Sequence, residues 1–129
     1  MSFSKSRFDK KYQFELTRFS NILDYIVIGG FSKLLSFFRK NYSSESLLSY
    51  ADLRFSDGKT YHKFFEYVGI TPPNYFYFKN GLLESRIKYQ KHKLIKMQSY
   101  DDEKTERTIM YEEGYYRIYD CGNLKFTLI

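Results

Sequence analysis

Apolar and polar residues alternate near the start of the chain, and this pattern predicts a strand followed by a helix. Tyr12, Phe14 and Leu16 are separated by single polar residues, a period of two that is typical of a half-buried strand. After a connection at residues 21–24, a short apolar run at residues 26–28 ends at Gly29-Gly30. An amphipathic helix is predicted next, because apolar side chains recur at i, i+3, i+4 and i+7: Phe31, Leu34, Leu35 and Phe38.

The middle of the chain predicts a strand, a second helix and a further strand. Residues 47–53 predict a buried strand, and residues 56–58 predict a turn in which Ser56 or Asp57 caps a helix. The helix is predicted by apolar residues at the same spacing, Tyr61, Phe64, Phe65 and Val68, with Gly69 as a left-handed C-terminal cap. Residues 71–73 stop it, and a strand at residues 75–79 ends at an Asn80-Gly81 turn.

The last third of the chain is less regular. Ile87, Leu94 and Met97 share one helical face, whereas Tyr89 and Ile95 lie off it, so a strand or loop in part of this region stays open. Residues 103–113 predict a helix that stops at Gly114, and residues 116–129 predict two short strands joined as a hairpin near residues 121–123. The order of elements predicts an α/β fold with a central mixed sheet flanked by helices.

Length and charge limit the class of protein. The 129 residues fit one domain, residues 1–129, in which residues 1–11 are predicted to be a mobile basic arm. The arm could reach phosphates, and the alternative that we favour is a disordered terminus. The net charge of +6 favours an acidic partner, and DNA is the partner we expect. Cys121 is the single cysteine, which excludes an internal disulfide. Without a signal-like or spanning apolar run, we expect a cytoplasmic protein with no membrane partner, in the host cytoplasm if it is encoded by a phage.

Aromatic residues are abundant: 14 Tyr and 13 Phe, with no Trp. Large rings bury much area per residue, so packing is expected to use roughly three quarters of them, and the others could stack on bases or line an interface.

A basic run without any acidic residue extends from Ser85 to Tyr100. We predict that it contacts nucleic acid, with phosphates held by the cations and bases stacked on neighbouring tyrosines. The alternative is a solvated basic face. The nucleic-acid-binding residues predicted from the sequence are Arg86, Lys88, Tyr89, Lys91, His92, Lys93 and Lys96.

The remaining reactive residues do not form a recognisable catalytic or metal site. His62 and His92 are expected to be surface residues, and Cys121 has no histidine near it in sequence. Asp52, Asp57, Glu84 and Lys88 could form an acidic nuclease cluster, a weaker alternative because the two aspartates are expected to serve a strand end and a turn. We therefore assign no catalytic or metal residue and expect a protein without enzymatic activity.

Four signatures in a fixed order resemble the C-terminal region of phage homing endonucleases whose nuclease half is of the very-short-patch-repair type. They lie at residues 29–35, 49–52, 58–70 and 71–77, and the resemblance continues through Ser85-Arg86, residues 91–94 and residues 114–123. The resemblance implies that the metal-binding acidic and histidine residues of the nuclease would lie upstream of this region. It therefore implies an accessory part that binds DNA, or assists a nuclease, and lacks the nuclease half.

The chain is also similar to the core of GNAT-type N-acetyltransferases. That resemblance implies a GNAT-like fold in which Gly29, Gly30 and Ser32 would bind the pyrophosphate of acetyl-CoA at a helix N-terminus, with residues 67–70 as the second signature. Two positions depart from the family: Ile26 stands where it carries Arg or Gln, and Phe31 where it carries a small residue that leaves room for the pyrophosphate. We expect no cofactor unless this alternative holds. A third alternative is a small phage effector that binds a host protein through an exposed aromatic patch.

Overall fold

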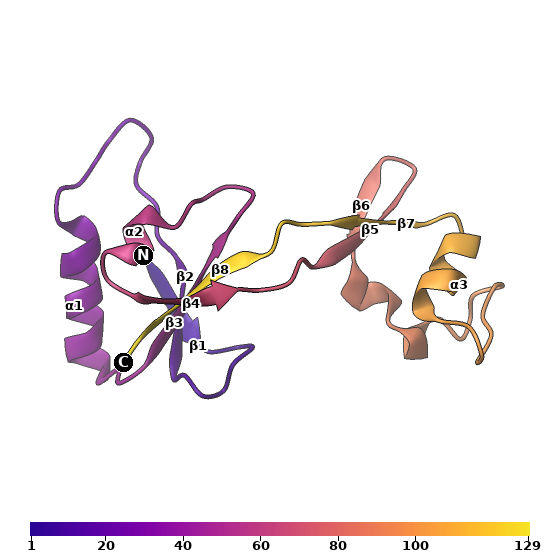
Figure 1. Cartoon of the computed structure of the whole chain (residues 1–129), viewed down its shortest axis with the longest axis horizontal. Helices are drawn as coiled ribbons and strands as arrows, with labels where there is room; N and C mark the ends of the chain where they lie inside the picture. Colours follow the sequence, from indigo (N-terminus) through magenta and orange to yellow (C-terminus); the bar gives the residue numbers. More distant parts are fainter. The chain divides into compact units, whose positions relative to one another are not determined.

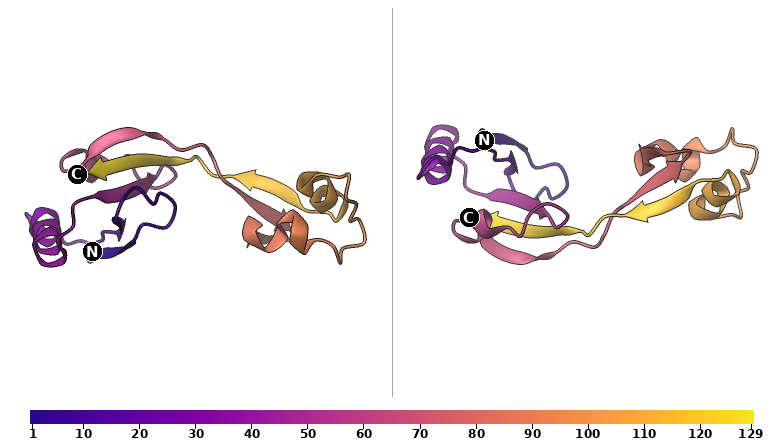
Figure 2. Two further views of the ribbon diagram at one scale, coloured as in Figure 1. Left: turned by 90° about the horizontal axis from the view of Figure 1, so that it is seen from below. Right: turned by 90° about the horizontal axis from the view of Figure 1, so that it is seen from above.

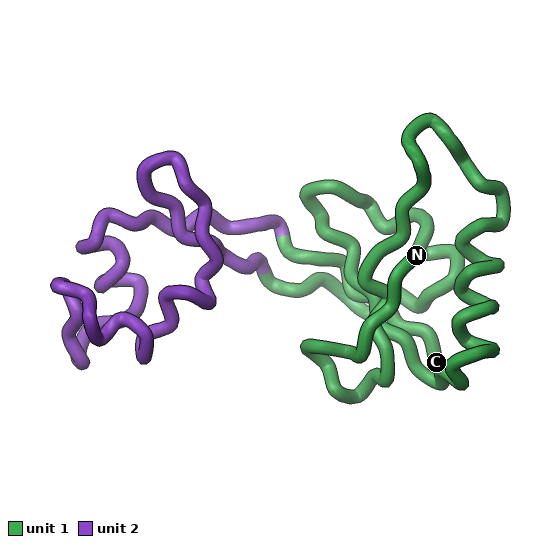
Figure 3. Tube along the Cα trace, turned by 180° about the vertical axis from the view of Figure 1, so that it is seen from behind, with its two compact units in different colours: residues 1–72, 122–129 green, residues 73–121 purple.

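The computed structural model describes residues 1–129, which form two compact units (Figure 3). Unit 1 contains residues Met1–Pro72 and Gly122–Ile129, and unit 2 contains residues Pro73–Cys121. Each unit is built on its own sheet, so the chain has the mixed α/β class predicted from its sequence. The two units are defined by the contacts between residues. A single folding domain is defined by one cooperative unfolding transition, so the single domain stays a prediction.

Unit 1 is a five-stranded mixed sheet in the order β1-β2-β3-β8-β4 (Figure 1). Strands β2 and β3 are parallel, and every other neighbouring pair is antiparallel. Strands β4 and β8 run side by side although 52 residues separate their ends in the sequence (Figure 2). The elements are β1 (Ser2–Lys5), β2 (Phe14–Arg18), α1 (Gly30–Tyr42), β3 (Leu47–Asp52), α2 (Lys59–His62), β4 (Glu66–Ile70) and β8 (Asn123–Leu128).

Helix α1 confirms the predicted amphipathic helix and connects the two parallel strands. Phe31, Leu35 and Phe38 are buried against the sheet, while Leu34 is nearly half exposed and lies outside the core. The aromatic ring of Phe31 contacts Phe64 at 4.8 Å between ring centroids. The core of unit 1 consists of Leu16, Phe31, Leu35, Phe38, Leu47, Ala51, Phe65, Leu124 and Phe126.

The prediction of a second helix, extending to Val68, is largely wrong. Helix α2 ends at His62, and the segment that was expected to complete it is strand β4, paired with β8. Gly69 has φ 155° at an irregularity of this pairing and is not a helix cap. The predicted turn is present, because Ser56 and Asp57 side chains accept hydrogen bonds from backbone N–H groups two residues ahead at 3.1 Å.

Within the predicted mobile arm, residues 2–5 form strand β1 of the sheet and residues 6–11 form the loop that follows it. Strand β1 pairs with β2, and Ser6 is buried. The following loop is anchored by two ion pairs, Arg7 with Glu15 at 2.8 Å and Asp9 with Lys125 at 2.9 Å. Because Glu15 is 3% exposed, its partner Arg7 neutralises a charge that burial would otherwise penalise.

Unit 2 is a three-stranded antiparallel sheet in the order β6-β5-β7, covered by short helices. Its elements are β5 (Tyr75–Lys79), β6 (Leu82–Ser85), the 3₁₀ turns η1 (Arg86–Tyr89) and η2 (Lys91–Lys93), α3 (Glu106–Glu112) and β7 (Tyr116–Tyr119). The predicted Asn80-Gly81 turn is confirmed: both residues have positive φ, 50° and 78°, as a two-residue hairpin turn with matching twist requires. Helix α3 confirms the helix that was predicted within residues 103–113, and it ends before Gly114, whose φ is 84°.

Strands β7 and β8 do not form the predicted hairpin. Strand β7 pairs with β5 in unit 2, whereas β8 lies between β3 and β4 in unit 1. The helical face predicted from Ile87 to Met97 is replaced by the two 3₁₀ turns. Leu94 is buried with Tyr77, Ile109 and Met110 in the core of unit 2.

Candidate nucleic-acid interface

The basic run from Ser85 to Tyr100 lies on η1, η2 and the turns that follow them, all in unit 2. Four of its five Lys and Arg residues are exposed, as is His92, and Lys91 is half-buried. The exposed residues are Arg86, Lys88, His92, Lys93 and Lys96. The run therefore presents positive charge to solvent, as the prediction requires.

Internal hydrogen bonds hold three of the lysines. The ammonium group of Lys88 lies 3.1 Å from the carboxylate of Glu84. Lys91 donates to the backbone oxygen of Asp102 at 2.5 Å, and Lys93 donates to the backbone oxygen of Ile87 at 2.7 Å. A backbone carbonyl oxygen carries no net charge, so Lys91 and Lys93 keep their positive charge. Of these three lysines, only Lys88 is paired with a carboxylate.

Tyr89 packs against the core of unit 2, so only part of its ring is accessible for the predicted stacking on bases. Its ring is half-buried against Tyr77 and Tyr115, and its hydroxyl donates to the carboxylate of Glu84. Burial and the bond to Glu84 raise the pKa of Tyr89 above its usual value. The hydrogen bond from Tyr89, and to a lesser extent the one from Lys88, lowers the pKa of Glu84 below its usual value.

Positive charge is unequally divided between the units. Unit 1 carries twelve Lys and Arg and seven Asp and Glu, a net charge of +5, whereas unit 2 carries nine and eight, a net charge of +1. The acid-free run is thus balanced by acidic residues elsewhere in unit 2, including the three at residues 101–103. The charges within the run alone do not indicate that unit 2 as a whole is nearly neutral.

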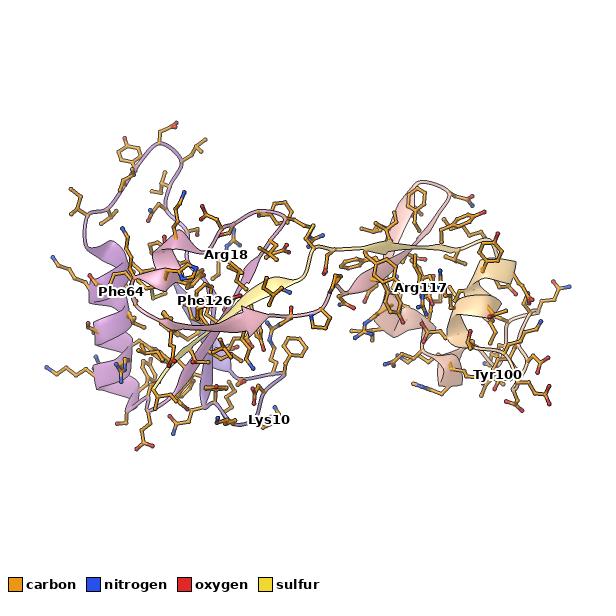
Figure 4. All side chains as sticks on the ribbon, in the orientation of Figure 1. Lys10, Arg18, Phe64, Tyr100, Arg117 and Phe126 are labelled. Carbon is orange, nitrogen blue, oxygen red and sulfur yellow. The ribbon has the colours of Figure 1, made fainter.

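A polar network inside unit 2 was not foreseen from the sequence. One carboxylate oxygen of Glu106 accepts hydrogen bonds from the hydroxyls of Tyr75 at 2.9 Å and Tyr77 at 2.8 Å. The guanidinium of Arg117 lies 3.9 Å from the ring centroid of Tyr75, donates to the Tyr77 hydroxyl at 3.1 Å and lies 3.6 Å from Glu106. Figure 4 labels Arg117 within this group of side chains. The alternation of Tyr75 and Tyr77 on one strand was the available signal, because both then point to the same face.

The glycine loop proposed for acetyl-CoA lies at the start of α1. Gly29 has φ 70°, and the Ser32 hydroxyl donates to the backbone oxygen of Gly29 at 3.0 Å. A Cβ atom on Gly30 would lie 3.1 Å from the Val27 side chain, so this side chain already fills the space beside the loop. Phe31, which stands where the acyltransferase family carries a small residue, points into the core of unit 1 and is 6% exposed.

The second acyltransferase signature, residues 67–70, lies in β4 and not at the end of a helix. The geometry of the glycine loop and of this strand therefore adds no support to the acyltransferase alternative.

The acidic residues of the alternative nuclease cluster have separate partners. Asp52 forms an ion pair with Arg54 at 2.7 Å and Asp57 with Lys59 at 2.9 Å, both in unit 1, while Glu84 belongs to unit 2. No group of three or more His, Cys, Asp or Glu side chains is arranged to hold a metal ion. Cys121 is an exposed free thiol.

No helix has the length and apolar character needed to cross a membrane. The chain matches none of the family models, curated proteins or solved structures with which it was compared.

Proposed function

We propose that the protein binds DNA through the basic run of unit 2, as an accessory domain of phage type without nuclease activity of its own. The observation that carries this proposal is the exposure of Arg86, Lys88, His92, Lys93 and Lys96 on two adjacent 3₁₀ turns and the residues after them, with no acidic residue between them. The lysines and the arginine among them attract the phosphate backbone and displace its counterions, which supplies most of the affinity for any DNA sequence.

The number of phosphate contacts predicts a salt dependence. Arg86, Lys88, Lys93 and Lys96 are exposed, whereas Lys91 is half-buried. Four contacts give a slope of about −4 for log K against log salt on duplex DNA. Phosphate contacts position a protein without specifying sequence, so unrelated duplexes should bind with similar affinity.

Charge reversal at Lys93 and Lys96 tests the proposal. The double variant Lys93→Glu/Lys96→Glu is expected to weaken binding to every duplex and to reduce the magnitude of the slope by about 2, measured by fluorescence anisotropy at several salt concentrations. Both side chains are exposed, so folding should be retained, and circular dichroism checks this.

The matched control is Lys33→Glu/Lys40→Glu, which makes the same change of charge on the exposed side of α1 in unit 1. It should keep most of the affinity. A greater loss in this control than in the unit 2 variant would contradict the proposal and assign DNA binding to unit 1, where the larger net charge lies.

A second candidate function, binding of a host protein by a phage effector, is favoured by the loop at residues 22–28. Its six large apolar side chains are 63% to 93% exposed: Ile22, Leu23, Tyr25, Ile26, Val27 and Ile28. Figure 4 shows side chains of this loop, between β2 and α1, projecting from the ribbon. Monomeric proteins rarely expose a contiguous apolar patch of this kind, which usually marks an interface.

The double variant Ile26→Ser/Ile28→Ser tests this second candidate. We expect it to fold normally, because both side chains are exposed, and to lose a stoichiometric protein partner that co-purifies with the parent. Equal partner retention by parent and variant, or a parent that retains none, would count against the candidate.

A further inference from the structure

A small hollow in unit 2 has an unusual lining. It has a volume of about 170 Å³ and is lined by five tyrosines and two arginines, with no acidic residue among them. Its residues come from β5, from α3 and the turn after it, and from β7, which is an edge strand of its sheet. The hollow lies outside the basic run at residues 85–100, so it is a separate feature of unit 2.

The floor of the hollow is fixed before any ligand arrives. Tyr77 is 1% exposed, and its hydroxyl bonds both to Glu106 and to Arg117. The guanidinium of Arg117 is further held by the ring of Tyr75 at 3.9 Å. Because these groups satisfy one another, they can present a rigid polar surface without rearrangement when a ligand binds.

The rim of the hollow carries aromatic rings that solvent reaches. Tyr111, Tyr116 and Tyr119 are 64%, 58% and 52% exposed, in contrast to the buried Tyr77. Tyr111 and Tyr116 contact each other edge to face, with 5.6 Å between ring centroids. Exposed rings held in this way offer faces on which a flat ligand can stack.

The charge at the rim indicates an anionic ligand. Arg107 is exposed, one turn from Tyr111 on α3, and has no carboxylate partner, unlike Arg117 with its nearby Glu106. A free guanidinium beside aromatic rings matches the phosphate and base of a nucleotide.

The volume limits the size of the ligand. A cavity of roughly 150 Å³ holds one benzene ring, and sites for drug-sized molecules begin at roughly 300 Å³. The hollow of about 170 Å³ therefore has room for one six-membered ring and not for a large coenzyme.

We propose that this hollow binds one pyrimidine nucleotide of single-stranded DNA, with the base stacked at Tyr111 and Tyr116 and the phosphate bound by Arg107. The inference rests on the proposed DNA binding and adds a preference for unpaired strands that the basic run by itself does not supply. A paired base is already stacked and hydrogen-bonded in the duplex, so it cannot enter the hollow.

Fluorescence anisotropy with labelled oligo(dT), oligo(dA) and duplex DNA of about 15 nucleotides tests the proposal. The parent should bind oligo(dT) more tightly than oligo(dA). Tyr111→Leu should weaken oligo(dT) binding about tenfold or more and leave duplex binding unchanged, whereas Tyr111→Phe, which keeps the ring, should bind like the parent. Arg107→Gln should reduce the magnitude of the salt slope on oligo(dT) by about 0.7.

The outcomes separate this inference from the proposed function. If Tyr111→Leu binds oligo(dT) like the parent while Lys93→Glu/Lys96→Glu loses duplex binding, the hollow is not a nucleotide site and the function stands. If dTMP alone shifts the NMR signals of Tyr111 and Tyr116 and duplex binding is absent, the hollow is a nucleotide site and the duplex interface fails. If the parent binds neither DNA nor dTMP, both proposals are overturned.

Discussion

Replacing Gly122 with alanine is expected to lower the free energy of unfolding by about 4 kcal/mol. An L-residue in the left-handed conformation costs roughly 1–2 kcal/mol, and Gly122 has φ 77°. A Cβ atom there would also lie 2.3 Å from the backbone oxygen of Thr71, far inside contact distance. Overpacking of this kind costs roughly 1–3 kcal/mol more.

Thr71 cannot easily move away from such a Cβ atom. Its N–H donates to the Asn123 backbone oxygen at 2.8 Å, and its hydroxyl accepts from the Asn123 N–H at 3.0 Å. Relief of the clash would therefore break bonds at the start of β8, a strand that pairs with two neighbours.

The matched control is Gly81→Ala. Gly81 has nearly the same φ, 78°, but a Cβ atom added there would have no neighbouring atom within 4 Å, so only the conformational cost of about 1–2 kcal/mol is expected. Urea denaturation of both variants measures the difference. Equal losses of stability would show that the contact with Thr71 adds nothing.

Replacing Glu106 with alanine is expected to lower the free energy of unfolding by about 3 kcal/mol. The change removes the shared acceptor of the Tyr75 and Tyr77 hydroxyls and leaves Arg117, whose side chain is 17% exposed, without its carboxylate. A buried polar or charged group that is left without a partner destabilises the fold by its full desolvation penalty. This penalty exceeds the net stabilisation that the lost hydrogen bond supplied.

Glu112→Ala is the control for the second prediction, because it makes the same substitution on the same helix. Glu112 pairs only with Lys104, and both side chains are more than one third exposed, so the loss should stay below about 1 kcal/mol. Thermal denaturation of the two variants compares them. A loss in Glu112→Ala as large as that in Glu106→Ala would contradict the assigned role of the network.

Elements with local determinants could be predicted from the sequence. Helix α1 is specified by its own apolar spacing, and the turn at Asn80 and Gly81 by two residues that tolerate positive φ. Strand β4 could not be predicted, since Tyr61, Phe64, Phe65 and Val68 fit a helix and only pairing with the distant β8 makes the second half extended. Tertiary context overrides local propensity in such cases.

The candidate sites also differ in how far the sequence alone could predict them. The basic run is visible in the sequence because its cations are closely spaced, and the structure exposes most of them. The inward position of Tyr89 depends on Glu84 and Tyr115, which lie 5 and 26 residues away. The hollow at Tyr111 combines residues from three separate segments, and no spacing rule connects them.

The position of β8 determines the order in which the two units can form during synthesis. Unit 2 is one continuous segment that precedes β8, so all of it emerges from the ribosome before β8 emerges. Until then β3 and β4 have no strand between them, and Phe126, the fully buried ring of unit 1, is missing from the core. The nascent chain therefore carries an incomplete sheet with unpaired strand edges, a state in which newly made proteins are prone to aggregate and depend on chaperones.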